Sequence, residues 1–357
     1  MLDRLVIRDF RCFQKTELRL DAQTTLLLGR NGQGKTSLME AACVLLRLQS
    51  PRTSVRQELI RLGAETAMVE GEVDGRALRC VMSPTTRRMA VEGATCPRMV
   101  DYLSQSGLVV WMDHADMGLL RGGADQRRRF LDFAASQMVP GYLKALRGYE
   151  RALRGRNFVL KRDASIRWPE AEAFAGVMEE HARVLIQGRS ELCQAMTGRV
   201  TEAHGVLSRG EEQVEIRYLP SCQSGDLREA LEARRAEESR LRTTVAGPHR
   251  DDLGLTLGGM NACSFASEGQ QRTLALSMKL AQAHALKAAK GKAPLMLIDD
   301  VFGELDPFRR RALMGYLPSD AQKIITTTQV DWLEEEPFLG SRYRVEQGCV
   351  EHLSDIC

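Results

Sequence analysis

The chain has 357 residues, of which 43% are hydrophobic and 27% charged, a composition that fits a globular protein of about two domains. No stretch is apolar enough for a membrane span, and the charged start MLDRLVIRDF argues against a signal peptide, so we expect a cytoplasmic protein without membrane contact. The net charge of +3 neither requires nor excludes nucleic acid, because a local basic patch is enough to bind phosphates.

The first third of the chain is predicted to contain strands and turns with one clear helix. Alternating or continuous apolar residues predict strands, and residues 36–48 have the apolar spacing of a helix. Three of the strands, at 68–73, 78–82 and 89–92, are separated by turn residues and are expected to form an antiparallel sheet. The other predicted strands are residues 5–10, 24–28 and 107–112.

The middle of the chain is predicted to be helical. Residues 124–162, 169–208 and 226–241 have helical apolar spacing, and Trp168-Pro169 is typical of a helix start. Heptads are not sustained over three or four repeats, which favours a packed helical subdomain over an extended coiled coil.

The last third returns to alternating helices and strands. Helices are predicted at 271–286 and 309–316, and strands at 294–299, 323–327 and within 343–351. We therefore expect an α/β ATPase lobe interrupted by a helical lobe, with boundaries at 1–115, 116–242 and 243–357.

The sequence gives no indication of a transition-metal site. The nine cysteines contain no CxxC pair and the six histidines contain no HxxxH pair, so we expect free and mostly buried thiols rather than a zinc ribbon.

A glycine-rich loop of the form GxxxxGK[ST] lies between the predicted strand 24–28 and the helix 36–48. Glycines let the backbone curl so that N–H groups point at phosphates, and the helix N-terminus adds partial positive charge. Lysine can reach the β- and γ-phosphates of ATP, and the threonine hydroxyl can ligate Mg²⁺. The alternative is a glycine-rich turn with an unrelated lysine. The predicted nucleotide-binding residues are Gly29, Arg30, Asn31, Gly32, Gln33, Gly34, Lys35, Thr36 and Ser37.

The apolar strand LMLID ends in two carboxylates, Asp299 and Asp300, as in a Walker B motif. Asp299 is expected to hold Mg²⁺ together with Thr36, and Asp300 to orient or deprotonate the attacking water. Many buried strands end in aspartate, so the motif gains its meaning from the glycine-rich loop. The long separation from Lys35 requires a large insertion, in agreement with the helical middle.

A third motif, SEGQQR, lies shortly before this strand and resembles the signature of ABC-type ATPases, whose serine faces the γ-phosphate held by the other subunit. Ser267, Gly269 and Gln270 are therefore predicted to bind nucleotide across a dimer. The alternative for the serine alone is an ordinary helix N-cap. Glu304-Leu305-Asp306 occupies the D-loop position. The segment Thr326-Thr327-Thr328-Gln329 stands where ABC transporters commonly have a histidine switch, which argues against a transporter subunit.

These motifs together resemble the RecF family of bacterial recombination mediators, which is related to the heads of Rad50 and SMC proteins. Several family elements lie outside the ATPase motifs and extend the resemblance over nearly the whole chain. They are LVIRDFRCF at the start, RRRFLD from Arg127, RNFVLK from Arg156 and TVAGPHRDD from Thr244. By this resemblance Arg11 is expected near the nucleotide. Trp111-Met112-Asp113-His114 departs from the family pattern, so no Q-loop residue is assigned.

The resemblance implies an ABC-type P-loop ATPase head that acts in recombinational DNA repair, replication restart and the SOS response. It further implies a homodimer that closes on ATP and Mg²⁺, binds single-stranded or gapped DNA, and hydrolyses ATP slowly as a switch. RecR- and RecO-type mediators would be its partners in recombinase loading. The alternatives are an ABC transporter subunit or another ABC-type head.

Two basic segments leave their roles open. Arg127, Arg128 and Arg129 either contact phosphates or form ion pairs with neighbouring acidic residues. His249-Arg250-Asp251-Asp252 either lines a site or forms a polar turn before a strand, and we favour a structural role.

Overall fold

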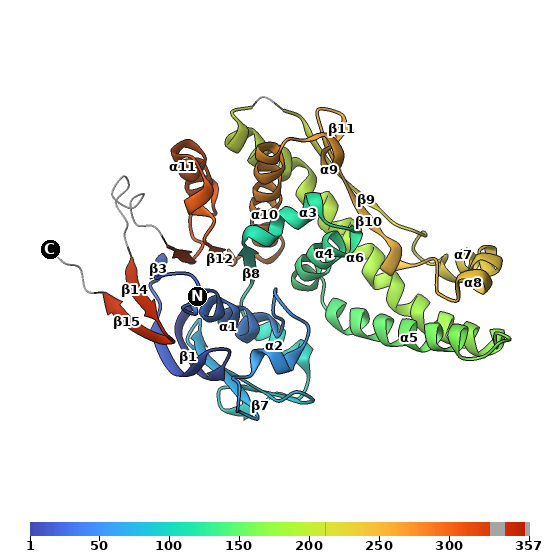
Figure 1. Cartoon of the computed structure of the whole chain (residues 1–357), viewed down its shortest axis with the longest axis horizontal. Coiled ribbons are helices and arrows are strands. Elements are labelled where there is room, and N and C mark those ends of the chain that lie inside the picture. Colours follow the sequence, from blue (N-terminus) through green and yellow to red (C-terminus); the bar gives the residue numbers. More distant parts are fainter. Residues whose placement is uncertain (211, 329–339, 354–357) are drawn as a thin grey trace. The chain divides into compact units, whose positions relative to one another are not determined.

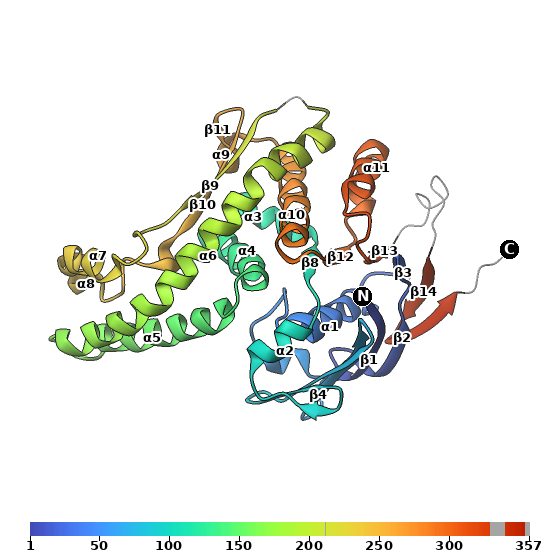
Figure 2. The ribbon, with the colours of Figure 1, turned by 180° about the vertical axis from the view of Figure 1, so that it is seen from behind.

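The computed structural model describes residues 1–210, 212–328 and 340–353. Contacts divide the chain into two compact units, unit 1 with residues Met1–Ala115 and Leu286–Cys357, and unit 2 with residues Asp116–Ala285. Each unit is built from segments that can be followed by colour in Figures 1 and 2. Within the described ranges, none of the helices has the length and apolar character needed to cross a lipid bilayer.

Unit 1 contains an antiparallel sheet in the order β2-β1-β4-β5-β6-β7. One face of its long strands is buried and the other exposed, as the alternation of β5 shows. The predicted antiparallel sheet is confirmed, and it also includes β2, which the sequence analysis missed. The strands are β1 (Leu2–Phe10), β2 (Phe13–Arg19), β4 (Ala67–Val73), β5 (Arg76–Met82), β6 (Arg87–Val91) and β7 (Ala94–Thr95).

A second sheet of unit 1, in the order β15-β14-β3-β13-β12-β8, is parallel except for its edge strand β15. Its central strands are almost wholly buried, in agreement with their continuous apolar sequences. Strand β13 lies between β3 and β12, so the carboxyl ends of these three strands meet at one edge. The strands are β3 (Thr24–Leu28), β8 (Val109–Met112), β12 (Leu295–Asp299), β13 (Lys323–Thr327), β14 (Ser341–Glu346) and β15 (Cys349–Leu353).

Helix α1 (Lys35–Arg47) is almost completely buried and contacts strands of both sheets, including β4 and β13. Its position explains why the predicted helix is so uniformly apolar after the glycine-rich loop. The remaining helical segments of this unit are η1 (Arg56–Leu59), α2 (Met99–Gln105), η4 (Phe302–Glu304) and α11 (Pro307–Tyr316).

Unit 2 is mainly helical, and its longest helix α6 runs beside α5 in both views (Figures 1 and 2). Gly155 makes this close approach possible, since a Cβ there would lie 2.5 Å from the ring of Phe174. One apolar cluster joins α4, α5 and α6 to strands β9 and β10 of the sheet β11-β10-β9. The predicted packed subdomain is therefore present. The helices are α3 (Gly118–Arg121), α4 (Ala124–Met138), α5 (Tyr142–Arg162), α6 (Trp168–Ser208), α7 (Leu227–Ala233), α8 (Arg235–Leu241), η3 (Pro248–Arg250) and α9 (Ala262–Phe265).

Two predicted helices are broken. Residues 124–162 form α4 and α5, separated by Pro140 and by Gly141 at a φ of 79°. Residues 226–241 form α7 and α8, with Arg234 between them outside helical geometry. The predicted start of α6, with proline in its first turn, is confirmed.

The contacts place the second boundary between the units after Ala285, whereas the sequence analysis expected it after residue 242. Strand β10 (Asp252–Leu257) pairs along its length with β9 (Val214–Leu219) and with the short β11 (Met260–Asn261), so this segment belongs to unit 2. Helix α10 (Glu268–Lys290) starts in unit 2 and reaches unit 1 from Leu286 onward, whereas η2 (His114–Met117) spans the first boundary.

The eight described cysteines are all free thiols, as expected. Four of the eight are buried, so the expectation that most of them are buried is met only for half.

Candidate nucleotide-binding site

The glycine-rich loop connects β3 to α1 in unit 1. Gly29, Gly32 and Gly34 all have positive φ values, of 155°, 80° and 110°. A Cβ on Gly29 would lie 2.3 Å from the carbonyl oxygen of Val345 in β14, so this position also requires glycine for space. The loop therefore has the tight backbone that the motif predicts.

The side chain of Lys35 is held inside the glycine-rich loop. Its ammonium Nζ donates hydrogen bonds to the carbonyl oxygens of Gly29 at 2.6 Å and Arg30 at 2.9 Å. Burial lowers the pKa of Lys35, while the charges of Asp300 and Asp299 oppose this shift. The ammonium is thus partly desolvated and held by neutral carbonyls that an anionic ligand can replace.

A chain of hydrogen bonds joins the start of α1 to the ends of β13 and β12. Thr36 Oγ1 donates to Asp299 Oδ2 at 2.7 Å, and Thr326 Oγ1 donates to Asp299 Oδ1 at 2.6 Å. The same threonine Oγ1 accepts the backbone N–H of Asp300 at 3.0 Å. The two Walker motifs are therefore in direct contact, through residues that are more than two hundred positions apart.

Asp300 differs from its neighbour. Its backbone is in the left-handed region at a φ of 54°, which is uncommon for a residue with a side chain. Its Oδ1 is buried and has no hydrogen-bond partner among the described residues. A carboxylate oxygen without a partner is available to accept a proton or a hydrogen bond from a ligand.

The oxygen atoms around Asp299 suit a hard divalent cation. A hydroxyl and a carboxylate in contact are donors that Mg²⁺ prefers, and the neighbouring Lys35 suits phosphate rather than metal. The residues predicted to hold Mg²⁺ thus fit that ion.

Arg11 is occupied by protein partners. Its guanidinium donates to both oxygens of the buried Glu40 of α1, at 2.8 and 2.7 Å, and to the carbonyl oxygen of Glu58 at 2.8 Å. The pKa of Arg11 is raised chiefly by its hydrogen bonds with Glu40. Its predicted contact with nucleotide stays a prediction, and its observed role is to join the first strand to α1.

The signature residues start α10 in unit 2. The backbone N–H of Gln270 donates to Ser267 Oγ at 3.3 Å, and the N–H of Ser267 donates to Gln270 Oε1 at 2.7 Å, which is a reciprocal capping box. Ser267 and Gly269 are exposed. Ser267 is therefore an N-cap of α10, as in the alternative interpretation. Because the residue is exposed, the helix N-terminus can still be reached by an anion.

The residues that follow Walker B form the start of α11. Asp306 Oδ1 accepts the backbone N–H of Arg309 at 2.9 Å and caps this helix. Glu304 lies in η4 and contacts His114 Nδ1 at 3.3 Å. Of the predicted switch segment, Thr326 contacts Asp299, whereas Gln329 lies outside the described residues.

The family elements of unit 2 form a buried polar network. Arg189 of α6 bonds Asp132 of α4 at 2.8 Å and Asp251 at 2.8 Å, and its side chain is 2% exposed. Ser221 donates its backbone N–H to Asp251 at 2.8 Å, and the Tyr218 hydroxyl also bonds this carboxylate. Asp251 is therefore a structural residue, as favoured for its segment.

The first arginine of RRRFLD belongs to this framework. Arg127 forms a bidentate pair with Asp252, with distances of 2.6 and 2.9 Å. Arg128 donates to the carbonyl oxygen of Asp251 at 2.8 Å, and Arg129 has only a loose contact with Asp125 at 3.8 Å. The ion-pair alternative is thus correct for Arg127, with a partner that the sequence analysis did not name.

The elements RNFVLK and TVAGPHRDD contact each other. Arg156 is paired with the buried Glu238 at 2.7 Å, and Asn157 Oδ1 accepts both the N–H and the hydroxyl of Thr244. His249 Nε2 donates to the Thr244 carbonyl oxygen at 3.0 Å, and Nδ1 accepts the Tyr149 hydroxyl at 2.7 Å. Burial lowers the pKa of His249 to about 4, so the neutral ring is the form held here.

The comparisons with known proteins agree with this geometry. A family model described as an AAA domain matches residues 4–81. A DNA replication and repair protein RecF from Anaeromyxobacter sp. (strain Fw109-5) is 38% identical over 98% of both chains. The chain belongs to the RecF family. A RecF protein from Halalkalibacterium halodurans is 32% identical, with coverage of 98% of this chain and 99% of the relative.

Solved structures show the same fold. The recombination mediator protein RecF–ATP of the RecFOR pathway superposes with a TM-score of 0.86 at 26% identity, over 99% of this chain and 97% of that RecF. An SMC head bound to part of ScpA gives a TM-score of 0.55 at 15% identity, over 99% of this chain and 96% of that chain, which supports the fold alone. The predicted ABC-type P-loop ATPase head with a helical lobe is confirmed.

Sequence reasoning missed the particular roles of two residues near the candidate site. Thr326 was recognised only as part of a switch segment, although its hydroxyl links Asp299 to the backbone of Asp300. Glu40, which holds Arg11, lies in an apolar helix, and a buried carboxylate in such a helix is the signal that could have revealed it.

Proposed function

We propose that this chain is an ATP-dependent DNA-binding protein of recombinational repair that acts as a nucleotide-driven switch. The observation that carries the proposal is the direct contact between Thr36 and Asp299, which brings the glycine-rich loop and Walker B into one site. The RecF relatives, one of them solved with ATP, support the same conclusion.

In the proposed site, Lys35 exchanges its two carbonyl partners for the β- and γ-phosphates. The loop N–H groups and the N-terminus of α1 add further donors for the same anion. Since the ammonium already lies in the loop, little side-chain ordering is left to the binding step.

Thr36 and Asp299 would hold Mg²⁺, which supplies charge neutralisation of the phosphates when bound. Asp300, with its unpartnered Oδ1, would orient the attacking water and accept its proton. We propose slow hydrolysis, suited to resetting a switch rather than to turnover.

Dimerisation completes the site in this proposal. Ser267 and the exposed N-terminus of α10 from one copy would meet the γ-phosphate held by Lys35 of a second copy, in a symmetric C2 dimer. ATP would then favour the closed dimer because it contacts both copies only in that state.

DNA would be retained by the closed dimer, at gaps or single-strand junctions, during replication restart and the SOS response. RecR- and RecO-type mediators are the proposed partners for loading the recombinase. A transporter subunit is not favoured, because the relatives that align over nearly the whole chain are RecF proteins.

The test is a mobility-shift assay with gapped DNA, with and without ATP. We expect retention that depends on ATP, and its absence would refute the proposal. Lys35→Ala should lose nucleotide binding, dimerisation and ATP-dependent retention together, whereas the exposed Lys161→Ala is the matched control.

Ser267→Arg separates the two halves of the site. It should bind nucleotide normally and fail to dimerise in sedimentation runs with ATP, whereas Ser104→Arg, at an exposed serine of α2, should dimerise. Normal dimerisation of Ser267→Arg would remove the signature helix from the mechanism.

A further inference from the structure

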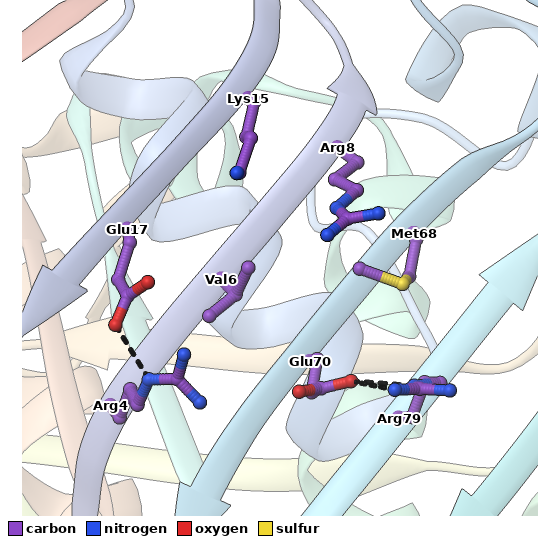
Figure 3. A pocket seen from close by; sticks show the side chains of 8 residues that line it. All are labelled: Arg4, Val6, Arg8, Lys15, Glu17, Met68, Glu70 and Arg79. Carbon is purple, nitrogen blue, oxygen red and sulfur yellow. Dashed lines mark hydrogen bonds and ion pairs between the residues drawn. The ribbon is translucent and has the colours of Figure 1, made fainter.

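The exposed face of the antiparallel sheet in unit 1 has a shallow groove of about 340 Å³ (Figure 3). Its lining comes from the outward residues of neighbouring strands and includes four cations and two carboxylates. The residues are Arg4, Val6, Arg8, Lys15, Glu17, Met68, Glu70 and Arg79. We call this surface the sheet groove.

Two of the four cations are neutralised by the groove itself. Arg4 Nε bonds Glu17 Oε1 at 2.7 Å, and Arg79 bonds Glu70 at 2.5 Å, directly across from it on the next strand. Figure 3 shows both pairs as dashed lines. These pairs account for both carboxylates of the lining.

Arg8 and Lys15 form no ion pair among the described residues; Glu17, whose pKa is lowered chiefly by its hydrogen bond with Arg4, attracts Lys15 to a smaller extent. Both side chains are exposed, they lie directly opposite each other on β1 and β2, and neither side chain forms an ion pair or hydrogen bond within the part of the chain that the structure describes. Like charges placed directly opposite each other destabilise a sheet. A lysine alone on the last strand would protect a sheet edge, but this role does not explain Arg8 on the inner strand.

Further cations extend the surface. Arg19 lies opposite Arg4 on β2, and Arg88 lies opposite Val81 on the far side of the groove. Both are exposed. Exposed cations thus reach across several strands rather than forming one isolated point, and the exposed Glu72 lies opposite Arg4 on β4.

No aromatic side chain lines the sheet groove, so it offers bases nothing to stack on. Proteins that hold single strands generally combine basic residues with aromatic platforms. A rigid duplex instead presents rows of phosphates that a flat basic surface can contact without reading sequence.

We infer that the sheet groove binds the phosphate backbone of duplex DNA, with Arg8 and Lys15 as the principal contacts. The inference rests on the proposed DNA-binding function and identifies which surface and which part of a gapped substrate are used. It assigns the duplex arm to this face and predicts binding that is independent of sequence.

The test uses the full chain with the double substitution Arg8→Gln and Lys15→Gln. The control is Arg154→Gln with Lys161→Gln, which removes the same charge from exposed positions of α5 that form no ion pair among the described residues. Fluorescence anisotropy with labelled duplex, gapped DNA and oligothymidine is measured with ATP over a series of salt concentrations.

We expect the groove variant to lose affinity for duplex and gapped DNA on the order of tenfold, with a salt slope reduced by about two, because each lost phosphate contact removes roughly 0.9 from that slope. Binding to oligothymidine, nucleotide binding and ATP-dependent dimerisation should match the wild type. The control should retain both the affinity and the slope.

Several outcomes overturn the inference. An unchanged duplex affinity and salt slope would show that Arg8 and Lys15 do not contact DNA, and an acidic protein surface would then be the better candidate partner. A loss confined to oligothymidine would contradict the duplex assignment, and an equal loss in the control would point to overall charge. If the wild type itself retains no DNA with ATP, the proposed function fails instead, so the two failures are distinguishable.

Discussion

Removing the guanidinium of Arg189 should destabilise unit 2 far more than an ordinary surface change. This side chain is 2% exposed and neutralises two carboxylates, Asp132 and Asp251, of which Asp251 is completely buried. Arg189→Met keeps an apolar stem but leaves both charges without their partner. Breaking a buried pair from one side costs about 3–5 kcal/mol.

The measurement is hydrogen exchange of the α6 amides, because it reports the opening of this unit alone. A cost of that size raises the opening equilibrium by roughly a hundredfold to several thousandfold, at about 1.4 kcal/mol for each factor of ten. The matched control is Arg183→Met, at an exposed position of the same helix, which should change stability by less than about 0.5 kcal/mol.

A double-mutant cycle makes the reasoning sharper. Asp251→Asn removes one of the stranded charges, so the Arg189→Met and Asp251→Asn double variant should be more stable than the sum of the single losses by about 1 kcal/mol or more. Additive losses, or an Arg189→Met variant as stable as its control, would refute the view that this network holds unit 2 together.

Three other predictions concern the loop, the carboxylate and the buried histidine. Gly29→Ala should abolish nucleotide binding in calorimetry, because its Cβ would lie 2.3 Å from the Val345 oxygen; normal binding would disprove this. Asp300→Asn should bind ATP and dimerise but not hydrolyse it in a phosphate-release assay, and retained hydrolysis would exclude Asp300 as the base. The lowered His249 pKa means that the unfolded state takes up the proton first, so stability should fall by up to about 3 kcal/mol as pH decreases from about 6.5 through about 4. His249→Gln should flatten this dependence in urea melts at several pH values, and an unchanged pH dependence would contradict the assignment.

The sequence was most informative where local chemistry decides the structure. The glycine-rich loop between β3 and α1 was predictable because glycines, lysine and the flanking apolar runs are contiguous. Strands β3 and β13 were located at their observed bounds, since both are short buried runs between polar segments.

The sequence did not predict features that depend on pairing between residues far apart in the chain. Residues 252–257 look like any other strand, and only their pairing with β9 assigns them to unit 2. Arg127 bonds Asp252 across 125 positions, so the sequence left its role open. The break between α4 and α5 was different, because Pro140-Gly141 did signal it and the apolar periodicity on both sides obscured it.

The order of strands in the parallel sheet has a consequence for biosynthesis. Among the described residues, strand β3, which leads into the glycine-rich loop, pairs with β13 and β14, and β8 pairs with β12. Both early strands therefore leave the ribosome long before these neighbours. The whole of unit 2 is synthesised after β8 and before β12. The contact of Thr36 with Asp299 can therefore form only after β12 has been synthesised, so the proposed nucleotide switch is assembled late in synthesis.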